Sequence, residues 1–126
     1  MPIFYFVPDQ EADAFQKPLT AERLLRSLGA TGKLAGFRCT VHMIERIKED
    51  PEQLQLITKR LYKETGKRFG SSAASVERNL RTLIHFCWNR TDHSFLEHIA
   101  GTILKDPPTN SEFLDILASY LREMGS

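Results

Sequence analysis

A chain of 126 residues with 41% apolar residues is long enough for one packed domain, and its net charge is only +1. Its apolar runs are far shorter than the roughly 20 residues of a membrane-spanning helix, and no basic region precedes the first run, so neither a membrane protein nor a secreted one is expected. Cys39 and Cys87 lack disulfide or metal-ligand spacing. Both are expected to be reduced, buried thiols of a cytoplasmic protein.

The small net charge hides an asymmetry along the chain. Between Lys59 and Arg90 there are eight basic and two acidic residues, whereas the rest of the chain has nine basic and fourteen acidic residues. A basic segment on an otherwise acidic body is typical of a surface that contacts phosphates. The charge distribution therefore favours a nucleic-acid partner.

The spacing of apolar residues predicts an N-terminal extension over residues 1–19 and a single all-α domain over residues 20–126. In the extension, the apolar run at residues 3–7 predicts a short strand, which is frayed, packs as an extension or pairs with another copy. The first four expected helices run from Thr20 as N-cap to Gly29, from Phe37 to Glu49, from Pro51 to Thr58, and from Leu61 to Phe69 with an end at Gly70. The next runs from Ala73 to Asn89 and is capped by Ser72. The last two run from Asp92 or Ser94 to Gly101, and from Glu112 to Met124 with Ser111 as the cap.

Two of these helices, Leu61 to Phe69 and Ala73 to Asn89, are joined by a short turn that contains glycine, as in a helix-turn-helix. The second helix is amphipathic. Its apolar stripe consists of Val76, Leu80, Leu83, Ile84, Cys87 and Trp88. Its opposite face carries Glu77, Arg78, Arg81, Thr82 and His85. Because the first half of the second helix meets base edges in this motif, the polar face is the candidate reading surface.

The residue types on this face suit base recognition, since arginine bonds to guanine O6 and N7 and glutamate accepts from the cytosine amine. The alternative is that Glu77 and Arg81, four residues apart, form an ordinary solvated ion pair. The neighbouring basic residues are candidates for phosphate contact. They are Lys59, Arg60, Lys63, Lys67 and Arg68.

Four runs of the sequence then match a known family: LITKRLY at 56–62, SVERNLR at 75–81, WNR at 88–90 and PTNSEF at 108–113. From about Thr20 onward the chain resembles the C-terminal DNA-binding effector domain of the stage-zero sporulation protein A family, the master response regulators of endospore formation. The resemblance implies a six-helix domain without strands. It also implies recognition of a TGTCGAA-like box in double-stranded DNA, with Glu77, Arg78 and Arg81 at base-contacting positions.

The resemblance further implies contact with the sigma factor of RNA polymerase, and either a homodimer or tandem binding at adjacent boxes. Ser72, Ser75 and Thr82 fall at supporting or backbone-contacting positions. This chain departs from the family at Ser75, where arginine is usual, and at Thr82, where histidine is usual, and both changes soften DNA contact. No receiver domain fits in the first nineteen residues, which leaves a stand-alone paralogue or a fragment.

The remaining residues indicate no catalytic, metal-binding or cofactor-binding site. The four histidines do not fall at metal-ligand spacings, and the chain has no phosphate-binding glycine loop, nucleophile elbow or carboxylate pair, so neither an enzyme nor a cofactor is expected. The aromatic residues Phe69, Phe86, Trp88 and Phe95 are expected in the core. Asn110 and Ser111 form either a partner-contacting loop or a helix cap. The second functional hypothesis is a protein-interaction module that dimerises or titrates a regulator or RNA polymerase.

Overall fold

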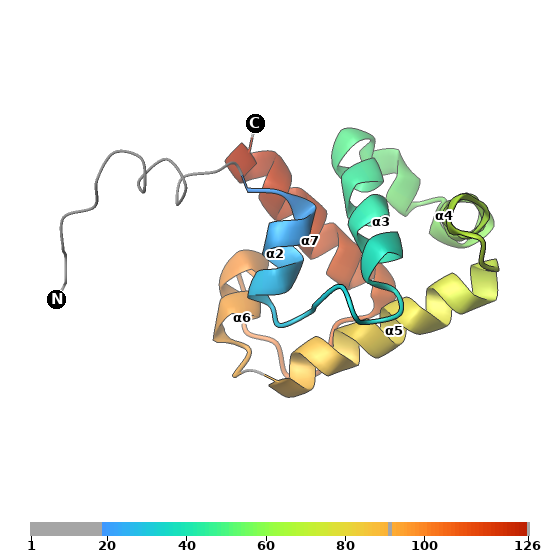
Figure 1. The fold of residues 1–126 in the computed structure, drawn as a ribbon. Coiled ribbons are helices and arrows are strands. Elements are labelled where there is room, and N and C mark those ends of the chain that lie inside the picture. The colour runs from blue at the N-terminus through green and yellow to red at the C-terminus, as the bar shows by residue number, and fades with distance from the viewer. Residues whose placement is uncertain (1–18, 91, 126) are drawn as a thin grey trace, which may run out of the picture.

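The computed structural model describes residues 19–90 and 92–125, and over these ranges the chain is helical without a strand (Figure 1). This part contains six α-helices, which confirms the expected all-α class. They are α2 (Ala21–Ser27), α3 (Phe37–Glu49), α4 (Tyr62–Phe69), α5 (Ala73–Arg90), α6 (Ser94–Ala100) and α7 (Asn110–Gly125). The strand expected at residues 3–7 lies outside the described residues.

Helix α7 is the centre of the packing and contacts α2, α3, α5 and α6 (Figure 1). Its buried residues are Phe113, Leu114, Leu117, Ala118 and Leu121. The apolar residues Ile116 and Tyr120 of the same helix are half-buried. Because neighbours cover α7 on several sides, its buried face is wider than the single stripe of a surface helix.

Most of the predicted helix ends are confirmed. Thr20 Oγ1 accepts a hydrogen bond from Arg23 N at 3.1 Å, and Ser72 Oγ accepts one from Ser75 N at 3.0 Å, so both residues cap the helices that follow them. Gly29 and Gly70 have φ angles of +104° and +70°, the left-handed conformation that ends a helix at little cost only when the residue is glycine.

The prediction of a single helix from Pro51 to Thr58 is wrong. The chain forms a 3₁₀ turn, η1 (Pro51–Leu54), and then a π-helical turn, η2 (Ile57–Leu61), that continues into α4. Asp50 tightens the first turn, because its carboxylate accepts from Glu52 N at 3.2 Å and from Gln53 Nε2 at 3.1 Å. The wide second turn is closed by Leu61 N donating to Leu56 O, five residues back, at 3.1 Å.

The predicted cap of the last helix is also wrong, because Thr109 and not Ser111 is the capping residue. Glu112 N donates to Thr109 Oγ1 at 3.2 Å, and Thr109 N donates to Glu112 Oε1 at 2.9 Å. This reciprocal pair is a capping box, which satisfies two backbone donors at once. As a result, Asn110 is the first helical residue, and its side chain is free to bond elsewhere.

The aromatic residues are less buried than the sequence suggested. Phe69 and Phe95 are 38% and 40% exposed, so their assignment to the core is wrong, and Phe86 and Trp88 are half-buried. Phe69 is the last residue of α4, and its ring meets the Arg68 guanidinium, whose central carbon lies 5.7 Å from the ring centroid. A position at a helix end leaves an apolar side chain fewer neighbours than the helical spacing implied.

Gly66 marks the closest approach within the α4–α5 segment. A Cβ atom at Gly66 would lie 2.5 Å from the backbone oxygen of Ser71, and Ser71 N donates to Gly66 O at 2.7 Å. We expect Gly66→Ala to lower the free energy of unfolding by about 1–3 kcal/mol, because backbone must move to admit the methyl group. The measurement is chemical denaturation followed by circular dichroism.

Gly32→Ala is the matched control, because the nearest atom to its Cβ would be the end of the flexible Arg26 side chain, at 3.7 Å. We expect this control to change the free energy of unfolding by less than about 0.5 kcal/mol. Equal stability of the two variants would contradict the close approach of α4 to the turn.

Candidate nucleic-acid interface

Helices α4 and α5 are consecutive, are joined by residues 70–72, and pack against each other. Figure 1 shows α4 along its axis beside the N-terminal end of α5. On another side, Gly36 approaches α5 so closely that a Cβ there would lie 3.0 Å from Asn79 O. The first half of α5 is therefore held between α4 and the start of α3.

The two faces of α5 are as the sequence predicted, with small differences. Val76, Leu80, Leu83, Ile84 and Cys87 are buried, whereas Trp88 is half-buried. On the opposite face, Arg78, Arg81, Thr82 and His85 are exposed and Glu77 is half-buried. A polar face with two arginines within the first half of α5 is therefore open to a large ligand.

Two internal contacts hold the side chains of this face. Arg81 Nη1 donates to Glu77 Oε2 in an ion pair between side chains that are 53% and 36% exposed. Arg78 Nη2 donates to Ser75 Oγ at 3.3 Å. The pair of Glu77 and Arg81 is the one that the alternative interpretation of this face expected. Because both side chains are more than a third exposed to solvent, the pair contributes little to stability and opens at little cost.

The basic residues of the neighbouring segment are all exposed. Lys59 and Arg60 lie on the turn η2, and Lys63, Lys67 and Arg68 lie on α4. Among the described residues, no carboxylate lies within ion-pair distance of Lys59, Lys63 or Lys67. These three ammonium groups therefore have no neutralising partner among residues 19–90 and 92–125. Ser72, by contrast, uses its hydroxyl as the cap of α5.

Sequence reasoning missed a long-range contact at this face. Asn110 Nδ2 donates to Tyr62 Oη at 3.0 Å and to the Glu77 backbone oxygen at 3.1 Å. Burial raises the pKa of Tyr62, and the hydrogen bond from Asn110 acts in the opposite direction. The partners are 48 and 33 residues from Asn110, so no local pattern indicated the contact.

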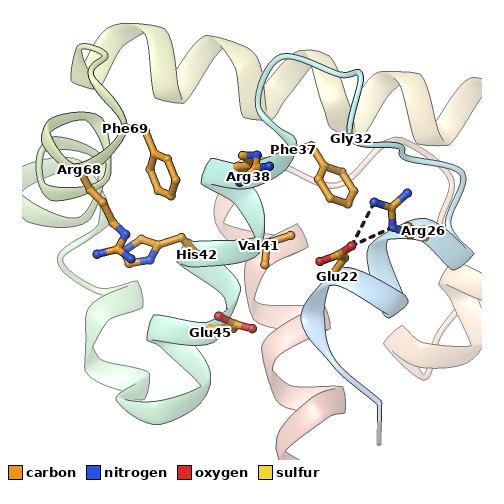
Figure 2. A pocket seen from close by; sticks show the side chains of 10 residues that line it. All are labelled: Glu22, Arg26, Gly32, Phe37, Arg38, Val41, His42, Glu45, Arg68 and Phe69. Atoms are coloured by element: carbon orange, nitrogen blue, oxygen red, sulfur yellow. Dashed lines mark hydrogen bonds and ion pairs between the residues drawn. The ribbon is translucent and has the colours of Figure 1, made fainter. Parts of the chain in front are cut away.

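Two hollows flank the α4–α5 pair. One, of about 470 Å³, is lined by Glu77, Arg81 and His85 of α5 and by residues 107–111, so the loop before α7 borders the polar face. The other, of about 360 Å³, lies between α2, α3 and the end of α4, and no residue of α5 lines it (Figure 2). Figure 2 shows Arg38 and Phe69 at this second hollow.

Other kinds of site find little support in residues 19–90 and 92–125. No three His, Cys, Asp or Glu side chains there come together as a metal ion would require, and none of the helices described is long and apolar enough to cross a membrane. Both cysteines are free thiols. Cys87 is buried as expected, and burial raises its pKa to about 11, whereas Cys39 is half-buried.

A family model described as sporulation initiation factor Spo0A C terminal matches residues 21–121, which include every residue of α2 to α6 and most of α7. The match therefore covers the polar face of α5, the basic residues before it and Asn110 at the start of α7.

The ion pair on α5 leads to a prediction about stability. We expect Arg81→Ala to change the free energy of unfolding by less than about 0.5 kcal/mol, because an exposed pair four residues apart on a helix contributes only a few tenths. Urea denaturation at low salt measures the effect. A loss above about 1 kcal/mol would show that Arg81 has a structural role beyond the pair.

Proposed function

The chain belongs to the family of the sporulation initiation factor Spo0A C-terminal domain, and on that premise we propose that it reads DNA sequence with α5 in the major groove. The family is one of sporulation-type DNA-binding effector domains, not of enzymes. The observation that carries the proposal is the exposed arginine-rich face on the first half of α5, directly after a short turn from α4. In a helix-turn-helix, that half of the second helix meets the bases.

We assign base contacts to Glu77, Arg78 and Arg81. The guanidinium groups of Arg78 and Arg81 are exposed and suited to guanine O6 and N7, and the Glu77 carboxylate to the cytosine amine, so the target is a G·C-containing box of the TGTCGAA type. Thr82 and Ser75 flank this trio with short hydroxyl side chains. Base reading by Arg81 requires the Glu77–Arg81 pair to open or to be shared with a base.

Phosphate contacts are assigned to the basic residues before and along α4. Lys59, Lys63 and Lys67 carry charges that no described carboxylate neutralises, and Arg68 lies at the end of α4 next to the turn. Phosphate contacts fix the register of a protein on the duplex without reading sequence. The DNA-binding surface would thus combine phosphate contacts from the basic residues before and along α4 with base contacts from α5. Ser72, in the turn between the two helices, would support this surface.

The remaining partners are also proposals. We propose that the protein acts in the cytoplasm, contacts the sigma factor of RNA polymerase, and binds either as a homodimer or in tandem at adjacent boxes. The competing function is an interaction module that titrates a regulator or the polymerase without reading DNA. The two functions differ in whether the isolated protein distinguishes a TGTCGAA duplex from a scrambled one.

The first test of the proposal compares a base contact with a phosphate contact. We expect Arg78→Ala to weaken binding to a TGTCGAA duplex by about 1–3 kcal/mol and to change binding to random DNA little, because the lost bonds are to a base edge. Lys67→Ala is expected to weaken both duplexes by similar factors. Fluorescence anisotropy at one stated salt concentration gives both affinities.

Folding is checked by circular dichroism for each variant. If Arg78→Ala and Arg81→Ala are folded and both leave the ratio of specific to random binding unchanged, the polar face of α5 is not the reading surface. The interaction-module function would then be favoured.

The proposed phosphate contacts predict that the affinity for DNA falls steeply as the salt concentration rises. Each neutralised phosphate contributes about −0.9 to the slope of log K against log salt concentration on duplex DNA. Removal of Lys63 or Lys67 should therefore make the slope shallower by about 1 for each residue. A slope near zero for the unaltered protein, or the same slope for the lysine variants, would argue against these contacts.

A further inference from the structure

We infer that Asn110 is a positioning residue that sets the orientation of the reading helix, a role that rests on the DNA-reading function proposed above. Its side-chain amide is within hydrogen-bond distance of both helices of the α4–α5 pair, at Tyr62 Oη on α4 and at the Glu77 backbone oxygen on α5. One group on α7 thus fixes both helices to the centre of the fold.

The chemistry of the partners settles the orientation of the amide. A backbone carbonyl can only accept a hydrogen bond, so the atom of Asn110 that faces Glu77 O at 3.1 Å must be the NH₂ group. The same nitrogen has two hydrogens, and the second serves Tyr62 Oη at 3.0 Å. Asparagine meets this geometry, whereas a carboxylate of the same shape would place an acceptor against an acceptor.

The bond to Glu77 reaches the part of α5 that carries the proposed base contacts. Glu77 supplies the bonded carbonyl and one of the base-contacting side chains, and Arg81 lies one turn further along the same helix. A shift of the α5 backbone at this point would move the base-contacting side chains together. Hydrogen bonds to bases lose strength steeply when distance and angle change, so specificity depends on this position.

Asn110 itself has little freedom to move. It is the first residue of α7, held on one side by the capping box of Thr109 and Glu112 and followed by the fully buried Phe113 and Leu114. Tyr62 is also fixed, because its side chain is buried and only 6% exposed. The Asn110 side chain therefore connects the polar face of α5 rigidly to the hydrophobic core.

Asn110→Asp is the decisive variant. It keeps the shape of the side chain, and a carboxylate in the first turn of α7 is favourable to the helix, so the fold is expected to persist. It removes the donor to Glu77 O. We expect the ratio of specific to random DNA binding to fall about three- to tenfold, which corresponds to the loss of roughly one hydrogen bond. Asn110→Ala is expected to give a similar fall.

Ser111→Asp is the matched control, because it adds the same charge one residue further on and keeps both hydrogen bonds from Asn110. It is expected to weaken specific and random binding by equal factors and to leave their ratio unchanged. Tyr62→Phe removes only the second acceptor and should give an intermediate ratio. If Asn110→Asp and Asn110→Ala are folded and bind with the unaltered ratio, Asn110 does not position the reading face.

A measurement without DNA separates this inference from the proposed function. Amide hydrogen exchange of the free protein should be faster around residues 77–81 in both Asn110 variants than in the unaltered protein and in Ser111→Asp, because α5 has lost its tether. If the Asn110 variants exchange faster but the unaltered protein shows no sequence preference, the DNA-reading function is overturned and the positioning role of Asn110 stands. Unchanged exchange would overturn the tether, whatever the protein does with DNA.

Discussion

The burial of α7 is the constraint on which the rest of the structure depends. Phe113, Leu114, Leu117 and Leu121 are each no more than 1% exposed, and the residues of α2, α3, α5 and α6 gather around them. Complete burial of each such side chain contributes about 1.5–3 kcal/mol to folding. Arg122 adds a polar link, because its guanidinium donates to the last carbonyls of α3 at Ile47 and Lys48. The proposed reading helix is thus a surface element attached to a central one.

The exposed face of α5 shows why the sequence left two interpretations open. The Glu77–Arg81 pair is formed, as expected for an ordinary solvated helix face, yet the same two side chains lie where a helix-turn-helix places its base contacts. The two interpretations are compatible, because an exposed pair is weak and a guanine offers Arg81 two acceptors in place of one carboxylate. The ratio of specific to random binding distinguishes them.

Local patterns predicted those parts of the fold that depend on local physics. Thr20, Ser72, Gly29 and Gly70 were identified as helix ends because caps and left-handed glycines act within a few residues. The polar face of α5 followed from helical spacing in the same way. The π turn before α4 and the exposure of Phe69 were not predicted, because they depend on packing that spacing does not encode. The cap at Thr109 is a local signal, because Thr109 and Glu112 are three residues apart, and it was missed in favour of Ser111. The contact of Asn110 with Tyr62 and Glu77 was the hardest to foresee, since it joins three separate helices.

The position of α7 in the chain has a consequence for synthesis. A ribosome makes the protein from its N-terminus, so α2 to α6 emerge before the helix that supplies the centre of their core. Until residues 110–121 have left the exit tunnel, α2, α3 and α5 lack the helix against which they pack. The arginines of α5 are then already present as charges, but they have no fixed orientation. A chain that stops short of α7 would accordingly retain the basic segment and lose the geometry, and its binding would be attraction to any polyanion rather than a choice among sequences.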